Sequence, residues 1–438
     1  MKSKLLLLQL LLCSYGFGQA GPSITIGSME EALNLVLEGN LSLSINALQL
    51  EKANMELSLA KSARMPQVNG SFSGQKNIEL ATTLVPGELF NQPGETVPVQ
   101  FGREYNYNAG INVNKPLIDL SNRQNIKSKR IDIAVQDMDN TLFREALISQ
   151  TVYAYYSALF SKEALGIAAQ DFAIADSILD ITASKFDQGL LDLAALNRAK
   201  INLNRVAQSL DESALVYEDA KNTLKEVLGI DRLSTVDLKE DSSIATFSSN
   251  NELHIGPNIE IDKNKQLQTR ADLSLKQARA AYFPTVSLNS YFGSQLFQDE
   301  FDFSLNDEGW APVQYVSLNL TVPIFNGFTT RKKVKIARIE AEVAALSYEQ
   351  EKDRLENSDE LLLKNYKLTA SIVAHSLDNY QLYKEIADLE FSKFSEGIVG
   401  LETYLNSFED YLYAKNGYLN SLTTFYRYYA QVYSRSEG

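Results

Sequence analysis

The sequence predicts a mainly α-helical protein with a small β part, in which the order helix–strand–strand–long helix–helix occurs twice. Three observations lead to this fold class. Proline is absent from residues 117–256 and after Pro323, and glycine is nearly absent from 117–188 and 328–396. Segments between the prolines alternate apolar and polar residues. Short phrases of the first half return in the second half in the same order, which is typical of an internal repeat.

Composition narrows the possible function classes. The chain has 438 residues, of which 45% are hydrophobic and 22% charged, so we expect it to fold. Asp and Glu number 55 against 41 Lys and Arg, and this acidic balance argues against nucleic-acid binding. One cysteine, Cys13, and two histidines, His254 and His375, are too few for a disulfide framework or a Cys/His metal site. We therefore expect no enzyme activity, no metal site and no cofactor.

The first 20 residues have the features of a secretory signal peptide. Lys2 and Lys4 precede an apolar run at residues 5–12, and small and polar residues follow up to Ala20. We expect cleavage near Ala20; a buried N-terminal helix is the alternative. No later segment contains about twenty consecutive apolar residues. If the chain enters a membrane, we expect a β-barrel, because lipid does not tolerate an open sheet edge.

Two long runs predict helices of unusual length. Residues 120–188 and 329–396 lack proline and are rich in Ala, Leu, Lys, Glu and Gln. Each would extend for about 100 Å as a helix. Gly189 and Gly397 interrupt the runs, and an apolar heptad pattern follows each glycine, at Leu196, Leu203, Leu210, Tyr217 and Leu224 and at Tyr404, Tyr411, Tyr418 and Phe425. We expect two antiparallel helical hairpins, at about 119–230 and 327–435.

The two halves of the chain match each other at several points. The phrase at 66–68 returns at 284–286, and the phrase at 185–189 returns at 393–397. The heptad positions correspond as well, from Leu196 and Tyr404 onward. We expect a first structural repeat at 21–230, an inter-repeat equatorial segment at 231–257 and a second structural repeat at 258–438.

Four segments between the prolines predict strands, at about 67–79, 104–116, 285–297 and 313–324. Residues 105–114 alternate Tyr, Tyr, Ala, Ile and Val with Asn, Asn, Gly, Asn and Asn. Strands of about ten residues with an apolar face and a polar face are typical of membrane β-barrels; a soluble, half-buried hairpin is the alternative. Tyr105 and Tyr107 at one end fit an aromatic girdle. The joining segments 81–103 and 298–312 are expected to be surface loops at the cell exterior.

Four strands are too few to close a membrane barrel, which needs at least eight. The chain is therefore expected to oligomerise, with two copies supplying eight strands or three copies supplying twelve. Three copies would also supply twelve helices, which is enough for a second, helical tube.

Several phrases resemble those of the TolC family of outer-membrane efflux and secretion channels. They are the Glu-Ala-Leu helix at 29–40, the strand entries at 60–66 and 278–284, the strand exits at 116–119 and 323–327, and the helix turns at 186–191 and 394–399. The match extends over essentially the whole chain after the signal peptide, and three of the four phrases occur in both halves.

This resemblance implies a homotrimer in which a twelve-stranded outer-membrane β-barrel continues into a periplasmic α-helical barrel. It also implies outer-membrane lipid, a periplasmic adaptor protein and an inner-membrane pump as partners. The residues that fall on the family's adaptor-docking helix tips are Gly189, Leu190, Leu193, Leu196, Gly397, Ile398, Leu401 and Leu405. The alternative is that these residues pack the turns, and both roles can hold together.

The positions of a gate depart from those of some relatives. Certain members carry aspartates just inside the second tip, where this chain has Thr403 and Asn406, with Glu402 beside Thr403. Without a ring of carboxylates, a strong cation-binding ring is not expected. Glu402, Thr403 and Asn406 are the gate candidates, and a solvated helix face is the alternative for Glu402.

Polar strand residues are the candidates for the lumen of the barrel: Asn106, Asn108, Asn112, Asn114, Ser317, Asn319 and Thr321. They are wettable and uncharged, so we expect little discrimination between solutes. The resemblance implies a passive efflux channel driven by a separate pump. The exit duct of a type I protein-secretion system is a variant, a periplasmic coiled-coil scaffold without a pore is a second class, and an enzyme is the remaining alternative.

Overall fold

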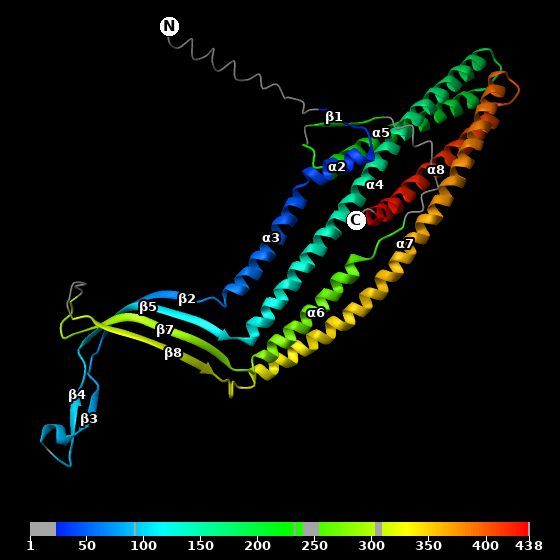
Figure 1. The fold of residues 1–438 in the computed structure, drawn as a ribbon. Coiled ribbons are helices and arrows are strands. Elements are labelled where there is room, and N and C mark those ends of the chain that lie inside the picture. Colours follow the sequence, from blue (N-terminus) through cyan, green and yellow to red (C-terminus); the bar gives the residue numbers. More distant parts are fainter. Residues whose placement is uncertain (1–22, 92, 232–233, 240–253, 303–308, 437–438) are drawn as a thin grey trace, which may run out of the picture. The chain divides into compact units, whose positions relative to one another are not determined.

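The computed structural model describes residues 23–91, 93–231, 234–239, 254–302 and 309–436 (Figure 1). The expected signal peptide at 1–20 and most of the expected segment at 231–257 lie outside the described residues. The described chain is predominantly helical with a minor strand part, which confirms the predicted fold class at this level.

The chain forms two compact units. The first contains the described residues up to Leu48, together with the described parts of Met138–Ile261 and Lys352–Gly438. The second contains Gln49–Asp137 and Asp262–Glu351. Each unit is therefore assembled from segments that lie far apart in the sequence.

The second unit contains a four-stranded antiparallel sheet. Its strands are β2 (Gln67–Lys76), β5 (Tyr105–Ile118), β7 (Thr285–Gln298) and β8 (Ala311–Thr321), in the order β2-β5-β7-β8. The central pair, β5 and β7, joins the two halves of the chain (Figure 1). The strands lie close to the ranges expected from the sequence, although β2 and β8 each end three residues earlier.

The segment at 81–103, expected to be a surface loop, contains regular structure. It forms an antiparallel hairpin of β3 (Thr82–Pro86) and β4 (Thr96–Gln100), with the short 3-10 helix η1 (Gly87–Phe90) between them. The prolines led to the wrong expectation. In a two-stranded ribbon each strand has a free edge, so a residue without an N–H, such as Pro98, is tolerated there.

The helices of the second unit expose much apolar surface. In α3 (Leu41–Ser62), Met55 is 61% exposed and Leu59 is 72% exposed. The first part of α7 (Thr329–Ser395) exposes a stripe of four large residues: Ile336, Ile339, Val343 and Leu346. Their spacing of three, four and three residues is that of a coiled-coil seam. Within the chain this seam is open to solvent.

Polar contacts tie the helices of the second unit together. Lys129 of α4 (Leu120–Asp187) lies 2.7 Å from the Glu56 carboxylate of α3. Arg270 of α6 (Ile259–Ala280) lies 3.4 Å from Asp132 of α4. The Lys129 ammonium holds the pKa of the Glu56 carboxyl below its ordinary value, chiefly through their hydrogen bond.

The first unit has a core near its short strands. β1 (Ser23–Ile26) pairs in parallel with β6 (Thr235–Leu238), which the sequence reading did not anticipate. α2 (Met29–Gly39) begins at Ser28, whose Oγ accepts a hydrogen bond from the Glu31 N–H, and it packs its apolar face inward. Fully buried members of this core include one residue from each of β1, α2, α4, α5 and β6: Ile26, Val36, Val152, Leu224 and Leu238.

Two helical hairpins make up the rest of the first unit. α4 is followed by α5 (Leu193–Val227), and α7 is followed by α8 (Leu401–Ser436). A second core draws on all four helices, with Ile178 of α4, Val206 of α5, Phe394 of α7 and Phe408 of α8 each at most 2% exposed. Among the helices of the described chain, none is apolar over a length sufficient to cross a lipid bilayer.

The heptad positions of α8 form an aromatic seam, defined here as Tyr404, Phe408, Tyr411, Tyr418 and Phe425, all of which are buried. The seam packs against aromatic residues of α7. The Tyr380 ring of α7 stacks on Tyr411 and Tyr418, with centroid distances of 5.9 and 5.6 Å. Burial raises the pKa of Tyr418 to about 12, and it also raises the pKa values of Tyr404 and Tyr411.

These raised pKa values predict alkaline destabilisation. In the unfolded chain tyrosine ionises near pH 10, before the buried hydroxyls can. The stabilising contribution is therefore complete below about pH 10 and is lost as the pH rises from there toward the folded-state pKa. Ultraviolet titration of tyrosinate should find fewer than the full set of 22 tyrosines ionising while the helical circular dichroism persists. Ionisation of all of them in one step near pH 10 with intact helices would contradict burial of the seam.

Candidate functional site

The sheet of the second unit has one polar face. The strand register places all seven lumen candidates on it: Asn106, Asn108, Asn112, Asn114, Ser317, Asn319 and Thr321. The amide of Asn112 donates a hydrogen bond to Ser71 Oγ at 3.0 Å, and that of Asn114 donates to the Asn289 side chain. Across the described residues of these four strands, this face carries no charged side chain.

The opposite face of the sheet is mainly apolar and largely exposed, with Lys76 at the end of β2 and Lys115 near the end of β5. Val68 of β2 is 63% exposed and Leu318 of β8 is 65% exposed. Tyr107 and its cross-strand partner Leu296 are exceptions, at 5% and 3% exposed, and the Tyr107 ring stacks on Phe72. A sheet with one exposed apolar face and one polar, uncharged face can separate lipid from water.

The two hairpin turns have the same local geometry. Gly189 and Gly397 adopt positive φ values of 77° and 79°, which glycine tolerates without strain. In the first turn the Leu190 N–H donates to the Lys185 carbonyl at 2.9 Å, and in the second the Ile398 N–H donates to the Lys393 carbonyl at 2.8 Å. These six-to-one bonds are those of a Schellman motif, which ends a helix at a glycine.

The predicted tip residues divide by exposure. Gly189, Leu193 and Gly397 are exposed, and so are Leu190 and Ile398, each at 67%. Leu196 and Leu405 are half-buried. Leu401 is 5% exposed within the second core, so its side chain packs the hairpin. The surface at the turns is therefore formed by the two glycines with Leu190, Leu193 and Ile398.

The gate candidates lie on the exposed side of α8. Thr403 and Asn406 face solvent, and Glu402 forms an ion pair with Arg198 of α5 at 3.2 Å. Seven residues further along both helices, Arg205 pairs with Glu409 at 2.5 Å. Two ion pairs thus link α5 to α8. In the described part of the chain, no three His, Cys, Asp or Glu side chains gather in a way that could hold a metal ion.

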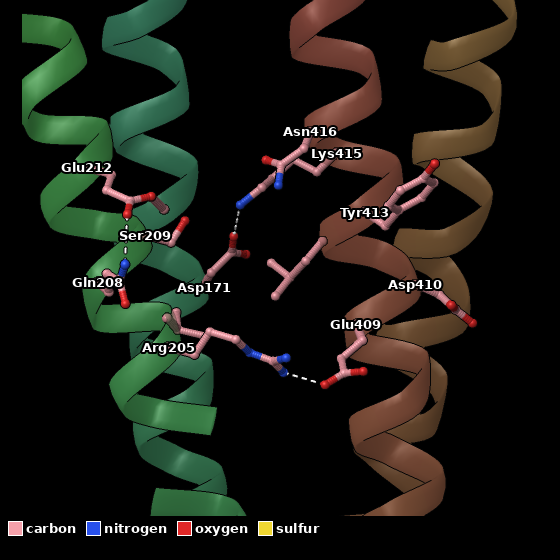
Figure 2. A pocket seen from close by; sticks show the side chains of 13 residues that line it. Asp171, Arg205, Gln208, Ser209, Glu212, Glu409, Asp410, Tyr413, Lys415 and Asn416 are labelled. Atoms are coloured by element: carbon pink, nitrogen blue, oxygen red, sulfur yellow. Dashed lines mark hydrogen bonds and ion pairs between the residues drawn. The ribbon is translucent and has the colours of Figure 1, made fainter. Parts of the chain in front are cut away.

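A buried polar cluster links α4 to α8. Lys415 lies 2.6 Å from the Asp171 carboxylate, and the two side chains are 5% and 2% exposed. The hydroxyl of Tyr411 donates to the other Asp171 oxygen at 2.9 Å. Figure 2 shows the Asp171–Lys415 pair in the wall of a pocket of about 520 Å³ between α4, α5 and α8, which the Arg205–Glu409 pair also lines.

Asp171, Arg198 and Arg205 were not among the residues predicted from the sequence. A signal for the buried cluster existed, because Lys415 occupies a heptad position that is otherwise apolar. A charge in a coiled-coil seam requires a partner, and that partner lies 244 residues away in the sequence.

The exposed Arg205–Glu409 pair is expected to contribute little to stability. Both side chains are about half exposed, at 51% and 50%, so water and salt screen the pair. Replacing Arg205 with alanine should change the free energy of unfolding by less than about 1 kcal/mol. A double-mutant cycle of Arg205→Ala and Glu409→Ala measures the coupling between them. A coupling well above about 1 kcal/mol would mean that the assembled protein removes this pair from water.

The fold is similar to that of solved outer-membrane channels. The chain is similar in structure to the CmeC outer membrane channel of Campylobacter jejuni, with a TM-score of 0.75 and 20% sequence identity over 93% of this chain and 85% of that chain. A solved structure of the outer-membrane channel OprN gives the same TM-score at 19% identity, with 94% of this chain and 90% of that chain covered. The fold is that of outer-membrane transport channels.

Sequence comparison gives matches to a family model and to named relatives. The family model described as outer membrane efflux protein matches residues 32–230 of the chain. Toxin and drug export protein A of Aggregatibacter actinomycetemcomitans is 21% identical, over 68% of this chain and 66% of that protein. The probable outer membrane lipoprotein SilC of Salmonella typhimurium is 24% identical, over 73% of this chain and 65% of that protein. The matches thus span just under two thirds of these relatives. The match to this family model confirms the resemblance inferred from the sequence phrases.

Proposed function

We propose that the chain is the outer-membrane channel of an efflux system, through which solutes released by an inner-membrane pump cross the periplasm and the outer membrane. The two-faced sheet carries this proposal. Its apolar face is suited to lipid, and its polar face, free of charge along the described strands, is suited to a water-filled lumen. The family and the fold, both of transport channels, support the same function.

The channel is proposed to be a homotrimer. Among the described residues, strands β2 and β8 each have an unpaired edge, and such edges are not tolerated in lipid. Three copies would close a twelve-stranded barrel, and the open seam on α7 offers a surface for a neighbouring helix. The family resemblance favours three copies over two. On this proposal the helices of the three chains, built from the two repeats at 21–230 and 258–438, form a periplasmic helical barrel.

The hairpin turns are proposed to dock a periplasmic adaptor protein. Leu190, Leu193 and Ile398 present apolar side chains beside tight glycine turns, a shape that another helical hairpin can pack against. Leu196, Leu401 and Leu405 support this surface from within the hairpins. Glu402, Thr403 and Asn406 are placed in this proposal just inside the opening, where the Arg198–Glu402 pair would favour the closed arrangement.

One variant of this function has support of its own. The relative from Aggregatibacter actinomycetemcomitans is named for both toxin and drug export. The same tunnel could therefore serve as the exit duct of a secretion system. A coiled-coil scaffold without a pore is disfavoured, because a scaffold has no use for a sheet with an exposed apolar face.

Planar-bilayer conductance tests the proposal, with the oligomer mass measured on the same detergent-extracted sample. A trimer with discrete current steps is the expected result. A monomer or dimer that never gives current steps would overturn the channel and favour the scaffold.

A further inference from the structure

The polar face of the sheet carries a pair of stacked tyrosines among residues that are otherwise mostly small or polar. Along the described strands this face consists of Asn, Gln, Ser, Thr, Gly and three small apolar residues (Pro116, Ala311 and Val313), apart from three aromatic side chains: Tyr291, Phe297 and Tyr315. Tyr291 and Tyr315 are direct partners across β7 and β8. Their rings stack with a centroid distance of 5.7 Å and an interplanar angle of 29°.

Two glycines make room for this pair. Gly110 and Gly293 lie opposite each other on β5 and β7. A Cβ atom on Gly110 would lie 2.7 Å from the Tyr291 hydroxyl, and one on Gly293 would lie 2.6 Å from it. The Tyr291 phenol therefore lies over a gap that only glycine leaves in the sheet. Packing of an aromatic ring over strand glycines holds Tyr291 in place.

Tyr315 is left with a free surface. It is 54% exposed, and β8 is the strand at the edge of the sheet. If β8 of one copy pairs with β2 of the next, the residues of β2 on the polar face are Gln67, Asn69, Ser71, Ser73 and Gln75. None of these is aromatic, so whatever the register, the neighbouring strand would not bury the Tyr315 ring under another ring.

We propose that Tyr291 and Tyr315 form a stacking platform that binds the aromatic rings of solutes moving through the channel. This inference rests on the proposed function, which makes the polar face the lumen. Tyr291 orients the platform and Tyr315 supplies the exposed ring. Aromatic pairs attract each other beyond their apolar contact, and a ring-bearing cation gains further from the negative face of the phenol. The face has no charge along the described strands, so this pair discriminates by aromaticity.

Current block in planar bilayers tests the platform with two monovalent cations, tetraphenylphosphonium and tetrabutylammonium. Only the first carries aromatic rings. Replacing Tyr315 with leucine should raise the half-blocking concentration of tetraphenylphosphonium by about threefold to tenfold and leave that of tetrabutylammonium unchanged. Tyr315→Phe should retain the wild-type ratio between the half-blocking concentrations of the two cations. The matched control is Ser317→Leu, which places the same side chain two residues along the same face.

The outcomes separate this inference from the proposed function. One contrary result is that Tyr315→Leu gives normal current steps and the same ratio of half-blocking concentrations for the two cations as wild type does. This result would overturn the proposed platform and leave the proposed channel function intact. An equal loss of block for both cations would also overturn it, because bulk alone would then explain the effect. If wild type gives no steps, the channel fails. Equilibrium dialysis of tetraphenylphosphonium against both proteins in the same detergent then decides the platform, which requires weaker binding by Tyr315→Leu.

Discussion

Replacing Lys415 with methionine is expected to lower the free energy of unfolding by about 3–5 kcal/mol. The substitution leaves the Asp171 carboxylate almost fully buried, with the Tyr411 hydroxyl as its remaining partner in the cluster. A buried charge without its counter-charge is strongly destabilising, because water no longer solvates it. Urea unfolding of the detergent-extracted protein, followed by circular dichroism, measures the loss.

The double variant Asp171→Asn with Lys415→Met is the matched test of this reasoning. It removes both charges and keeps an oxygen that can accept the Tyr411 hydrogen bond, so most of the lost stability should return. Lys221→Met is the control, because Lys221 pairs with Glu218 one helical turn away on the same helix. This substitution should lower the free energy of unfolding by less than about 1 kcal/mol. A Lys415→Met protein as stable as wild type would show that Asp171 does not depend on this ammonium.

Placing aspartate at both Leu190 and Ile398 is expected to abolish transport while leaving the channel itself intact. Leu190 and Ile398 are each 67% exposed at a hairpin turn, so the substitutions should change the folding stability of the isolated chain little. If an adaptor covers these residues, two carboxylates would be buried without partners, and the affinity should fall by tenfold or more. Cells carrying the variant should become sensitive to efflux substrates, and the purified trimer should keep its conductance.

The control for this variant lies on α5, the helix that follows Leu190, but away from the turn. Leu215 of α5 is 63% exposed, and Leu215→Asp should leave transport unchanged. Full transport by the Leu190→Asp, Ile398→Asp variant would remove the turns from the docking surface. Loss of conductance as well would show that the turns stabilise the channel.

Local pattern was sufficient to predict the large elements. The alternation at 105–114 and the proline-free runs around Gly189 and Gly397 depend on neighbours in sequence, and β5, α4 and α7 lie close to the expected ranges. The short pair β1 and β6 escaped notice because four residues carry almost no periodic signal and their pairing is remote. β3 and β4 escaped because proline at a free strand edge looks like a loop signal.

The polar contacts between helices were harder to predict from the sequence. Lys415 marked a break in an apolar seam, but only the fold shows that Asp171 is its partner. Arg198 and Arg205 carry no signal at all, since charged residues on an exposed helix face are ordinary. Tyr291 likewise looks like a common strand residue until the register places Gly110 and Gly293 beneath its ring.

The pairing of β5 with β7 sets the order in which the chain can mature. The middle of the sheet forms between residues as far apart as Tyr105 and Gln298, and the core around Ile178 needs Phe408. The amino-terminal half is therefore made, and leaves the ribosome, long before its packing partners exist. Closing such long loops is slow, and the unpaired half exposes strands that can associate wrongly meanwhile. A cell producing this protein therefore has to keep the first half from aggregating until synthesis is complete.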